Sequence, residues 1–535
     1  VGSIVGMIPE GLYFLTSLAL VASIIRLAGR RTLVHDMDCI ETLAHVDVLC
    51  VDKTGTITEP EMRVSRVQPL DEGSAETFHT RLCDYAAASI DNNATMLALK
   101  QYAQQELQRR PHTAEHAVAM QPFSSKEKYG SVTFADGRYL LGAPEFVLRE
   151  AYPAVAEMLT PYSEAGGRVL LLARETENGA PEALGFVVLE NPIRENAKQT
   201  FAYFKEQGVT VKVISGDNPV AVSRIAADAG IENAERWLDA SAVHSDEQLV
   251  QAAESYTVFG RVTPQQKQLL VRALQDAGHT VAMTGDGVND ILAMKDADCS
   301  VAMASGSEAA AQSAQVVLLE SDFARMPEVV LEGRRVVNNV QRSASLFLVK
   351  NIFSLMMALF SVIFMLTYPL EPSQISLISA FTIGIPGFLL ALEPNKERIQ
   401  GNFLRNVLLK ALPAGLTDVL AVGALVVCGE VFSLPQEDIA TAATMLLAVV
   451  GFMILVQISR PLNAMKYAIL IGDALGLILC GIFLNQLFAL NAMSEICVLL
   501  LIVFAFASES LFRNLSLLVR SIQSWLEKKR EKRRS

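Results

Sequence analysis

The chain has 535 residues, of which 51% are hydrophobic and only 19% are charged, and its mean hydropathy is +0.31. This balance excludes an ordinary soluble enzyme, and a formal net charge of −12 argues against a nucleic-acid partner. The seven cysteines are scattered without a CxxC pair, which excludes a disulfide scaffold and gives no support to a zinc site.

The chain opens on an apolar run, 1–26, that is long enough to span a bilayer as a helix. Pro9, Glu10 and Gly11 interrupt the run, and we expect the helix to unwind there and free backbone carbonyls. A carboxylate at this depth is costly and marks a functional site, and broken helices of this kind form ion sites in transporters. Because the run begins without a Met, we expect the chain to be a piece of a longer protein.

The residues that follow this run have the composition of a soluble part of the protein. Within that part, three apolar segments end in turns of small residues that contain aspartate. Segments 46–51, 208–214 and 280–283 are predicted strands, each followed by a helical segment. In open α/β sheets the ligand site lies at the carboxyl ends of the strands, so we expect these three ends to form one pocket. The residues expected in that pocket are Asp52, Thr54, Ser215, Gly216, Asp286, Asn289 and Asp290.

This set of residues suits phosphoryl transfer. A carboxylate can attack a γ-phosphoryl group to form an aspartyl-phosphate, and Mg²⁺ is needed to hold the two negative groups together. We predict Asp52 as the nucleophile and Asp286 as a Mg²⁺ ligand, with Asp290 orienting Asp286 or a metal-bound water. Three further groups are predicted to hold phosphate oxygens: the amides of Ser215 and Gly216 and the ammonium group of Lys267.

The motifs resemble those of a known family. Asp52-Lys53-Thr54-Gly55-Thr56 matches the phosphorylation signature of the P-type ATPases without a mismatch, and residues 284–290 match the hinge motif of that family. Ser215-Gly216-Asp217 resembles the family's TGD segment with Ser for Thr, and residues 263–267 resemble the segment with a phosphate-contacting Lys. Residues 190–194 resemble the DPPR motif, with Asn191 in place of its Asp.

The resemblance runs over the whole chain and implies a multidomain membrane protein with an α-helical transmembrane bundle. It implies an α/β haloacid dehalogenase-like phosphorylation domain, built from 27–60 and 190–337, with an inserted α+β nucleotide-binding domain, 61–189. It implies that the catalytic residues are Asp52, Lys53, Thr54, Ser215, Gly216, Asp217, Lys267 and Asp290. The implied cofactors are ATP and Mg²⁺, with the metal held by Asp52, Thr54 and Asp286.

The inserted domain has two segments that resemble the family's nucleotide site. Residues 123–128 resemble the segment whose aromatic side chain stacks on adenine, with Lys128 as a cationic contact. Residues 141–145 resemble the KGAPE motif, but Leu141 replaces its Lys, so ATP is expected to bind more weakly or to depend on Arg168. The implied nucleotide-binding residues are Phe123, Lys128, Gly142, Arg168 and Arg194.

From residue 338 to residue 513 nearly every residue is apolar, in six runs that could each span a bilayer. The runs are 343–366, 375–393, 408–431, 441–459, 467–487 and 493–513. Lys and Arg occur in every second loop and in a basic tail, 514–535, so we expect the soluble part and the C-terminus in the cytoplasm. We therefore predict seven spanning helices, in a bacterial plasma membrane, and a tail that lies against anionic lipid.

The Pro-Glu-Gly-Leu segment in the first run resembles the cation-pumping subclasses of the family, and the resemblance to calcium pumps extends to the second and third runs. It implies that Glu10, Asn351, Ser354, Ser379 and Thr382 bind the transported cation. Ser354 and Ile383 stand where calcium pumps have acidic ligands, so this site offers one carboxylate, hydroxyls, an amide and carbonyls. Since Ca²⁺ accepts about six to eight such oxygens, one Ca²⁺ per cycle is the first choice.

Two parts of the family pattern are missing from the sequence. The TGE loop of the actuator domain does not occur, and neither do the three transmembrane helices that precede the Pro-Glu-Gly-Leu helix in the family. We therefore expect an incomplete pump whose missing N-terminal part is one of its partners. Such a chain could phosphorylate Asp52 without completing transport.

The predicted function is ATP-driven cation transport through an aspartyl-phosphate, with ATP, the cation and the lipid bilayer as partners and no nucleic acid. Two alternatives stay open: a pump for Mg²⁺, Mn²⁺, a monovalent cation or a polyamine, and a membrane-tethered phosphatase on the same fold. Glu10 in a broken spanning helix argues against the phosphatase, and the intact Asp52, Asp286 and Asp290 argue against a non-catalytic scaffold.

Overall fold

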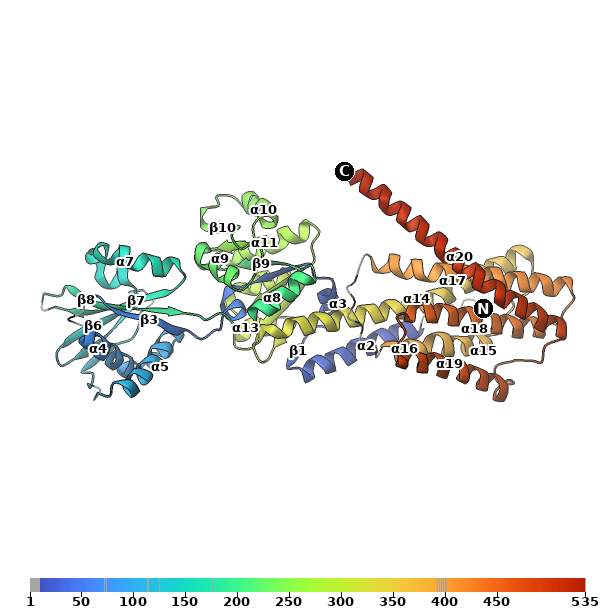
Figure 1. Ribbon diagram of the computed structural model, residues 1–535, viewed down its shortest axis with the longest axis horizontal. Coiled ribbons are helices and arrows are strands. Elements are labelled where there is room, and N and C mark those ends of the chain that lie inside the picture. Colours follow the sequence, from blue (N-terminus) through green and yellow to red (C-terminus); the bar gives the residue numbers. More distant parts are fainter. Residues whose placement is uncertain are drawn as a thin grey trace. The chain divides into compact units, whose positions relative to one another are not determined.

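The computed structural model describes residues 10–535, apart from thirteen residues and the side chains of Glu10 and of 526–534. The thirteen residues are Glu72, Ser74, Thr113, Ala114, Ser125, Glu177, Leu392, Pro394, Lys396, Arg398, Gln400, Gly401 and Ser535. The chain forms two units (Figure 1). The central unit comprises Leu27–Val329, and the helical unit comprises the segments before and after it.

The central unit contains an eight-stranded sheet whose neighbouring strands are all parallel, except for the first pair. Its spatial order is β1 (Thr32–Val34), β14 (Val316–Leu318), β13 (Cys299–Met303), β12 (Val281–Gly285), β2 (Val48–Val51), β9 (Thr210–Ile214), β11 (Val258–Gly260) and β10 (Trp237–Asp239). The accompanying helices are α3 (Asp38–His45), α8 (Ala197–Glu206), α9 (Pro219–Asp228), α10 (Asp246–Ser255), α11 (Pro264–Asp276), α12 (Ile291–Asp296) and α13 (Glu308–Ser313). Short helical turns are η1 (Lys53–Ile57), η4 (Ala240–Ala242), η5 (Val288–Asp290) and η6 (Phe323–Arg325).

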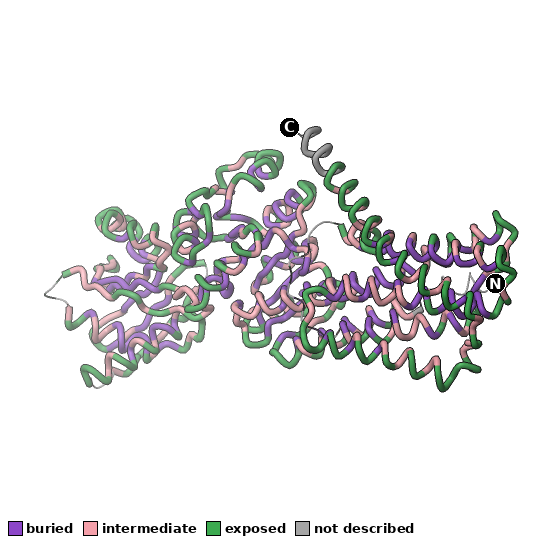
Figure 2. Tube along the Cα trace, turned by 45° about the vertical axis from the view of Figure 1, so that its right-hand side comes forward, coloured by how far each residue is buried: buried purple, intermediate pink, exposed green. Residues whose placement is uncertain are grey.

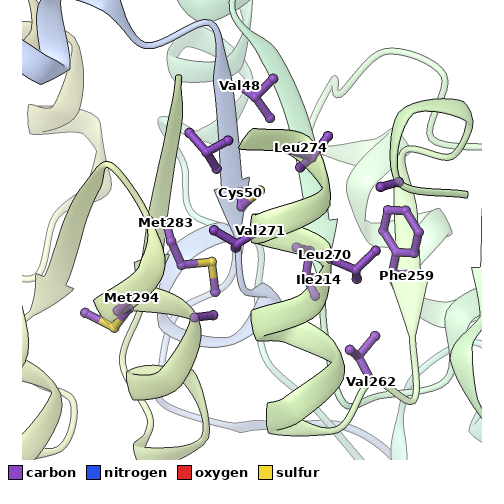
Figure 3. Packing of buried hydrophobic residues seen from close by; sticks show 14 of the residues in the cluster. Val48, Cys50, Ile214, Phe259, Val262, Leu270, Val271, Leu274, Met283 and Met294 are labelled. Atoms are coloured by element: carbon purple, nitrogen blue, oxygen red, sulfur yellow. The ribbon is translucent and has the colours of Figure 1, made fainter. Parts of the chain in front are cut away.

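Strand β2 lies inside this sheet, and all four of its residues are buried. A parallel sheet is covered on both faces, which is why β2 is continuously apolar instead of alternating. Figure 3 shows Leu270, Val271 and Leu274 of α11 directed at the side of the sheet that carries Val48 and Cys50. These three residues are spaced so that they lie on one face of the helix. Burial of this face fixes α11 against the sheet, in which Asp52 directly follows strand β2.

The second sheet of the central unit has six antiparallel strands. Its order is β3 (Arg63–Pro69), β8 (Pro181–Glu190), β7 (Arg168–Glu175), β6 (Gly137–Gly142), β5 (Tyr129–Phe134) and β4 (Ala119–Gln121), with helices α4 (Ala75–Ala88), α5 (Ala94–Arg109), α6 (Pro144–Leu148), α7 (Pro153–Glu164) and the turn η3 (Arg149–Ala151). Neighbouring strand residues point to opposite faces. Leu172 therefore packs with Phe78 of α4 and Leu99 of α5, whereas Leu171 packs with Leu159 of α7.

Two antiparallel connections link the two sheets of the central unit. Thr58 pairs with Ile193, and the amide of Glu59 donates to the Pro192 carbonyl at 2.8 Å. The side-chain amide of Asn191 lies 3.1 Å from the Glu59 carbonyl and 3.3 Å from the carbonyls of the next two residues. An Asp carboxylate accepts hydrogen bonds and donates none, so it could not make these contacts. Asn at this position therefore fastens the two connections together.

The helical unit contains the remaining helices, and seven helical segments of the described chain are long and apolar enough to cross a membrane. The helices are α2 (Glu10–Gly29), α14 (Met326–Phe364), α15 (Pro372–Ser379), the π-helical turn η7 (Ala380–Gly384), α16 (Ile385–Ala391), α17 (Phe403–Val431), α18 (Gln436–Ser459), α19 (Ala464–Phe483) and α20 (Glu495–Arg534). Large apolar side chains such as Ile363 and Phe506 are mostly exposed on them, as expected for a surface that faces lipid.

The helical unit differs from the sequence-based expectation at three places. Helix α14 begins at Met326, well before the apolar run that it contains, so the helix is longer than the expected membrane segment. Helix α20 continues through the basic tail to Arg534, and exposed residues are frequent in the part of the tail up to Trp525 (Figure 2). Gly11 and Leu12 are helical, so the expected unwinding does not extend to them, while Pro9 and the side chain of Glu10 lie outside the described residues.

Candidate active site

Three carboxylates meet at the carboxyl ends of two neighbouring strands of the eight-stranded sheet. Asp52 follows β2, Asp286 follows the adjacent β12, and Asp290 ends the turn η5. One oxygen of each carboxylate lies within 4.8 Å of the other two. Parallel strands bring their carboxyl ends to the same edge, which is why residues far apart in the sequence converge here.

Lys267 supplies the positive charge of this cluster. Its Nζ lies 3.1 Å from Asp52 Oδ1 and 2.6 Å from Asp290 Oδ1, and the residue is 3% exposed. Helix α11 begins at Pro264 after Thr263, whose side chain forms a capping box with Gln266, so Lys267 stands in the first turn. Burial opposes the charge of Lys267, but the attraction of the two carboxylates outweighs it and raises the pKa of the ammonium group.

Glycine is required at two positions beside these carboxylates. Gly55 has a φ of +72°, and a side chain there would overlap the Asp286 carboxylate. A side chain at Gly285 would lie 2.5 Å from Cβ of Asp290. The glycines of both motifs are thus explained by the close approach of backbone and carboxylate.

The environment of the carboxylates favours a bound cation. Burial, together with repulsion from Asp52 and Asp290, raises the pKa of Asp286 to about 6. Burial also raises the pKa of Asp52, against the opposing effect of Lys267. Clustered carboxylate oxygens are the ligands that Mg²⁺ uses in phosphoryl-transfer sites, and one lysine does not neutralise three carboxylates. This donor set therefore fits Mg²⁺.

Other predicted catalytic residues lie around the cluster in roles that the structure specifies. Lys53 forms an ion pair with Asp217, and Thr54 lies in the turn η1 directly after Asp52. Arg194, expected to bind nucleotide, donates to the Gly55 carbonyl at 2.6 Å and so supports that turn.

The expected role of the Ser215 amide is wrong in this structure. This amide donates to the Phe259 carbonyl at 2.9 Å as part of the sheet, so it does not point into the pocket as a free donor. The hydroxyl of Ser215 accepts from the Asp217 amide at 3.3 Å, and its own proton can still be donated. The hydroxyl of Ser215, and not its amide, is therefore the group of this residue that still has a proton to donate, and Gly216 follows it in the same turn.

Four of the five predicted nucleotide-binding residues, all except Arg194, lie at one corner of the six-stranded sheet. The Phe123 amide donates to Asp91 at 3.0 Å and the Arg168 guanidinium donates to Thr95 at 2.7 Å, so both residues lie against the start of α5. The Phe123 side chain is 44% exposed. Asp91, which fixes the backbone of Phe123, was not singled out from the sequence, where it is one polar loop residue among several.

Lys128 and Gly142 are neighbours in the same corner. The Ala143 amide donates to the Lys128 carbonyl at 3.0 Å, and Tyr129 pairs with Gly142 across β5 and β6. A side chain at Gly142 would overlap Lys128 and Tyr129, which explains the glycine. Leu141 is 4% exposed and packs in the apolar cluster under α4 and α5, so the substitution of the usual Lys adds to the core.

Within the helical unit, three of the predicted cation ligands line one small cavity. Ser354 of α14, Ser379 of α15 and Thr382 of η7 border a space of about 50 Å³. Asn351 is not among the described residues that line it, and its Oδ1 is buried without a hydrogen-bond partner in the described part of the chain. The side chain of Glu10 lies outside the description. Asp418 of α17 also lines the cavity and was missed, although an acidic residue inside an apolar run is a signal in itself.

Known proteins resemble both the central unit and the chain as a whole. A family model described as haloacid dehalogenase-like hydrolase matches residues 46–298. A probable cation-transporting ATPase, exp7, from Streptococcus pneumoniae is 38% identical over 514 residues, which cover 92% of this chain and 65% of the relative. The calcium-transporting ATPase CtpE of Mycobacterium tuberculosis is 41% identical over 501 residues, 89% of this chain and 62% of the relative. The chain belongs to the P-type ATPases.

This P-type ATPase also resembles a human protein, the calcium-transporting ATPase type 2C member 2, at 28% identity over 512 residues, 82% of this chain and 54% of the relative. The chain spans somewhat less than two thirds of the length of the curated relatives that it matches. Membership of the family accounts for the combination of an α-helical membrane bundle with a haloacid dehalogenase-like domain.

Proposed function

We propose that this P-type ATPase uses ATP to drive the transport of a cation, through a phosphate bound covalently to Asp52. The observation that carries the proposal is the cluster of Asp52, Asp286 and Asp290 around the buried Lys267 at the carboxyl ends of β2 and β12. A phosphatase-type sheet alone would leave the function open, since the same fold supports several activities. The apolar helices and the relatives' names favour a pump.

In the proposed reaction a carboxylate oxygen of Asp52 attacks the γ-phosphorus of ATP. The bond from that phosphorus to its bridging oxygen breaks, ADP leaves with the electron pair, and an acyl phosphate remains on Asp52. Asp286, Asp52 and Thr54 are proposed to hold Mg²⁺, which when bound would neutralise charge on the transferred phosphoryl group. Lys267 holds Asp52 and Asp290 in position. The Ser215 hydroxyl lies at the same edge of the sheet and is proposed to donate a hydrogen bond to a phosphate oxygen.

The nucleotide is proposed to bind at the corner of the six-stranded sheet formed by Phe123, Lys128, Gly142 and Arg168. The exposed ring of Phe123 is free to stack on a purine, and Arg168 stands at the start of α5, where helix amides and the guanidinium favour negative phosphate. In this assignment the segment 61–189 is the nucleotide-binding domain, and 27–60 with 190–337 is the phosphorylation domain.

The protein is an integral membrane protein, and we propose that the central unit and the C-terminus lie in the cytoplasm at a bacterial plasma membrane. The supporting observation is that Lys and Arg concentrate in alternate loops and after residue 514. Ca²⁺ is the proposed cargo, because two relatives are named calcium-transporting and the otherwise mostly apolar cavity includes four side chains that carry oxygen, Ser354, Ser379, Thr382 and Asp418.

The decisive experiment measures acyl phosphate on the purified protein from radiolabelled ATP across a panel of cations. We expect label that is stable in acid and lost in hydroxylamine, and whose level changes with Ca²⁺ more than with Mn²⁺, monovalent cations or polyamines. Labelling that no cation changes would contradict transport and favour a membrane-tethered phosphotransferase. A response to Mn²⁺ alone would replace Ca²⁺ as the cargo while leaving the pump in place.

Mg²⁺ binding at the active site is expected to weaken in mild acid. The pKa of Asp286 is raised to about 6, so below that pH the carboxyl is protonated in the metal-free protein and must lose its proton when Mg²⁺ binds. The apparent affinity should therefore fall up to about tenfold per pH unit below about pH 6 and level off above it. Calorimetric titration in two buffers of different ionisation enthalpy measures the released proton, and a flat affinity with no proton release would contradict the assignment of Asp286.

A further inference from the structure

Helix α17 carries an acidic side chain at the middle of its length. Asp418 lies near the centre of the helix, which spans Phe403–Val431, and the residue is 4% exposed. The residues that follow it along the buried face are apolar, among them Val422 and Leu425. Burying a carboxylate in the middle of a membrane helix costs free energy, so an acidic residue at this position indicates a functional site.

Asp418 differs from the acidic residues of the helical unit that stabilise its structure. Glu393 accepts from Arg342 at 3.1 Å, from Lys466 at 3.0 Å and from Asn463 at 2.8 Å. Asp438 accepts from the Ser494 amide at 2.8 Å. The Oδ1 atom of Asp418, in contrast, is buried and has no hydrogen-bond partner among the residues that the structure describes. An unpaired buried carboxylate is destabilising, and a bound cation would remove that cost.

The space beside Asp418 is suited to such a cation. Asp418 borders the cavity of about 50 Å³ together with Ser354, Ser379 and Thr382, from four different helical elements, and most of the remaining lining is apolar. The Thr382 hydroxyl donates its proton to the Ile378 carbonyl at 2.8 Å, so only lone pairs remain to face the cavity. Pro386, at the start of α16, has no amide proton to donate to the preceding π-helical turn.

Two glycines allow the helices to come close enough to form this site. A Cβ at Gly415, one turn before Asp418, would lie 2.7 Å from Ile352 of α14. A Cβ at Gly451 of α18 would lie 2.8 Å from Thr382. The close approach of α17 to α14 and of α18 to η7 therefore depends on residues without side chains, and it brings Asp418 to the level of Ser354.

We propose that Asp418 is a direct ligand of the transported cation and supplies a carboxylate from α17 to a site whose other side-chain oxygens come from Ser354, Ser379 and Thr382. This inference rests on the proposed function. It adds a ligand from a helix in which the sequence analysis predicted none. The carboxylate of Asp418 offsets the absence of acidic residues at Ser354 and Ile383.

Lys350 also lines the cavity, and it has an interaction of its own within the protein. Its positive charge repels cations in the cavity, because like charges repel strongly across a short distance in a medium of low polarity. With one carboxylate, that of Asp418, set against one ammonium group among the described lining residues, the proposed site has charge for no more than one Ca²⁺ per molecule.

The test is equilibrium binding of radioactive Ca²⁺ to the detergent-purified protein without ATP, compared with the Asp418→Asn variant. This change keeps the side-chain shape and removes the carboxylate charge, and we expect the affinity to fall at least about thirtyfold. Asp473→Asn is the matched control, because Asp473 of α19 is also 4% exposed, has an unpartnered buried oxygen among the described residues, and does not line the cavity. We expect the control to bind Ca²⁺ as the unaltered protein does.

A second variant and a stability measurement keep the test decisive. Ser354→Ala should weaken Ca²⁺ binding several-fold by removing one ligand oxygen, and the unfolding temperature of Asp418→Asn without Ca²⁺ should equal or exceed that of the unaltered protein. Unchanged Ca²⁺ affinity in Asp418→Asn overturns the inference and leaves the proposed function standing, as does an equal loss in Asp473→Asn. If the unaltered protein binds no Ca²⁺, the inference and the calcium assignment both fail, while labelling of Asp52 by ATP still tests the phosphorylation step.

Discussion

Replacing Asp52 by Asn is expected to reduce the transfer of phosphate from ATP to the protein to the background level. The Asp52 carboxylate is the proposed nucleophile, and an amide at this position is too weak a nucleophile to attack the γ-phosphorus. The measurement is acid-stable label from radiolabelled ATP after rapid quenching. The binding of ATP should be unchanged, since four of the five predicted nucleotide-binding residues lie at the corner of the six-stranded sheet.

The fold should survive this substitution, because it removes one of three carboxylates that lie within 4.8 Å of each other and so relieves repulsion. Asp246→Asn, at an exposed position in the first turn of α10, is the matched control and should label as the unaltered protein does. Retention of acid-stable label on the Asp52→Asn protein would mean that another residue is the nucleophile.

Replacing Lys267 by Met is expected to weaken both the active site and the central unit. Lys267 is 3% exposed and bonds to Asp52 and Asp290, so its removal leaves buried carboxylates without their cation. Removing one partner of a buried ion pair typically costs about 3–5 kcal/mol of stability. Phosphorylation should fall at least about 100-fold, the range for loss of one charge-stabilising donor. Chemical denaturation and acid-stable labelling measure the two effects.

The stability loss in the Lys267→Met protein should depend on pH in a defined direction. Lys267 lowers the pKa of Asp52 against the effect of burial, so without the ammonium group the pKa of Asp52 rises further in the folded state, and the folded protein binds more protons than the unfolded chain. The free energy of unfolding should therefore decrease as the pH rises from about 5 to about 8, and added Mg²⁺ should restore part of it. Lys295→Met, an exposed lysine of α12, is the control, and an equal loss in that variant would contradict a specific role of Lys267.

The catalytic part of the site was largely predictable because strand ends and their turns are local features. A short apolar segment followed by Asp-Lys-Thr-Gly-Thr fixes a strand and its turn, and the rule for parallel sheets then brings Asp52 and Asp286 to one edge. The Ser215 amide could not be assigned in this way. Whether it points into the pocket or bonds to Phe259 depends on the pairing of β9 with β11, which involves residues distant in the sequence.

The membrane part shows the same division between local and long-range information. Apolar length alone predicts spanning helices, because about 20 apolar residues cross a bilayer whatever their neighbours are. It gives no information on which residue of each helix faces an interior cavity. Asp418 and Asp473 are both acidic residues in apolar runs and equally buried, yet only Asp418 is among the described residues that line the cavity.

By itself the sequence determined the strand ends that carry the carboxylates and the apolar runs. These properties follow from residue types over a few helical turns or one strand. Only the tertiary structure decided that Lys267 contacts both Asp290 and Asp52, which lies 215 residues away from it in the sequence. It alone also decided that Asp418 of α17 lines the cavity. The reason is that helix rotation and the close approach of helices at Gly415 and Gly451 are set by packing between distant segments, and local residue patterns do not contain that information.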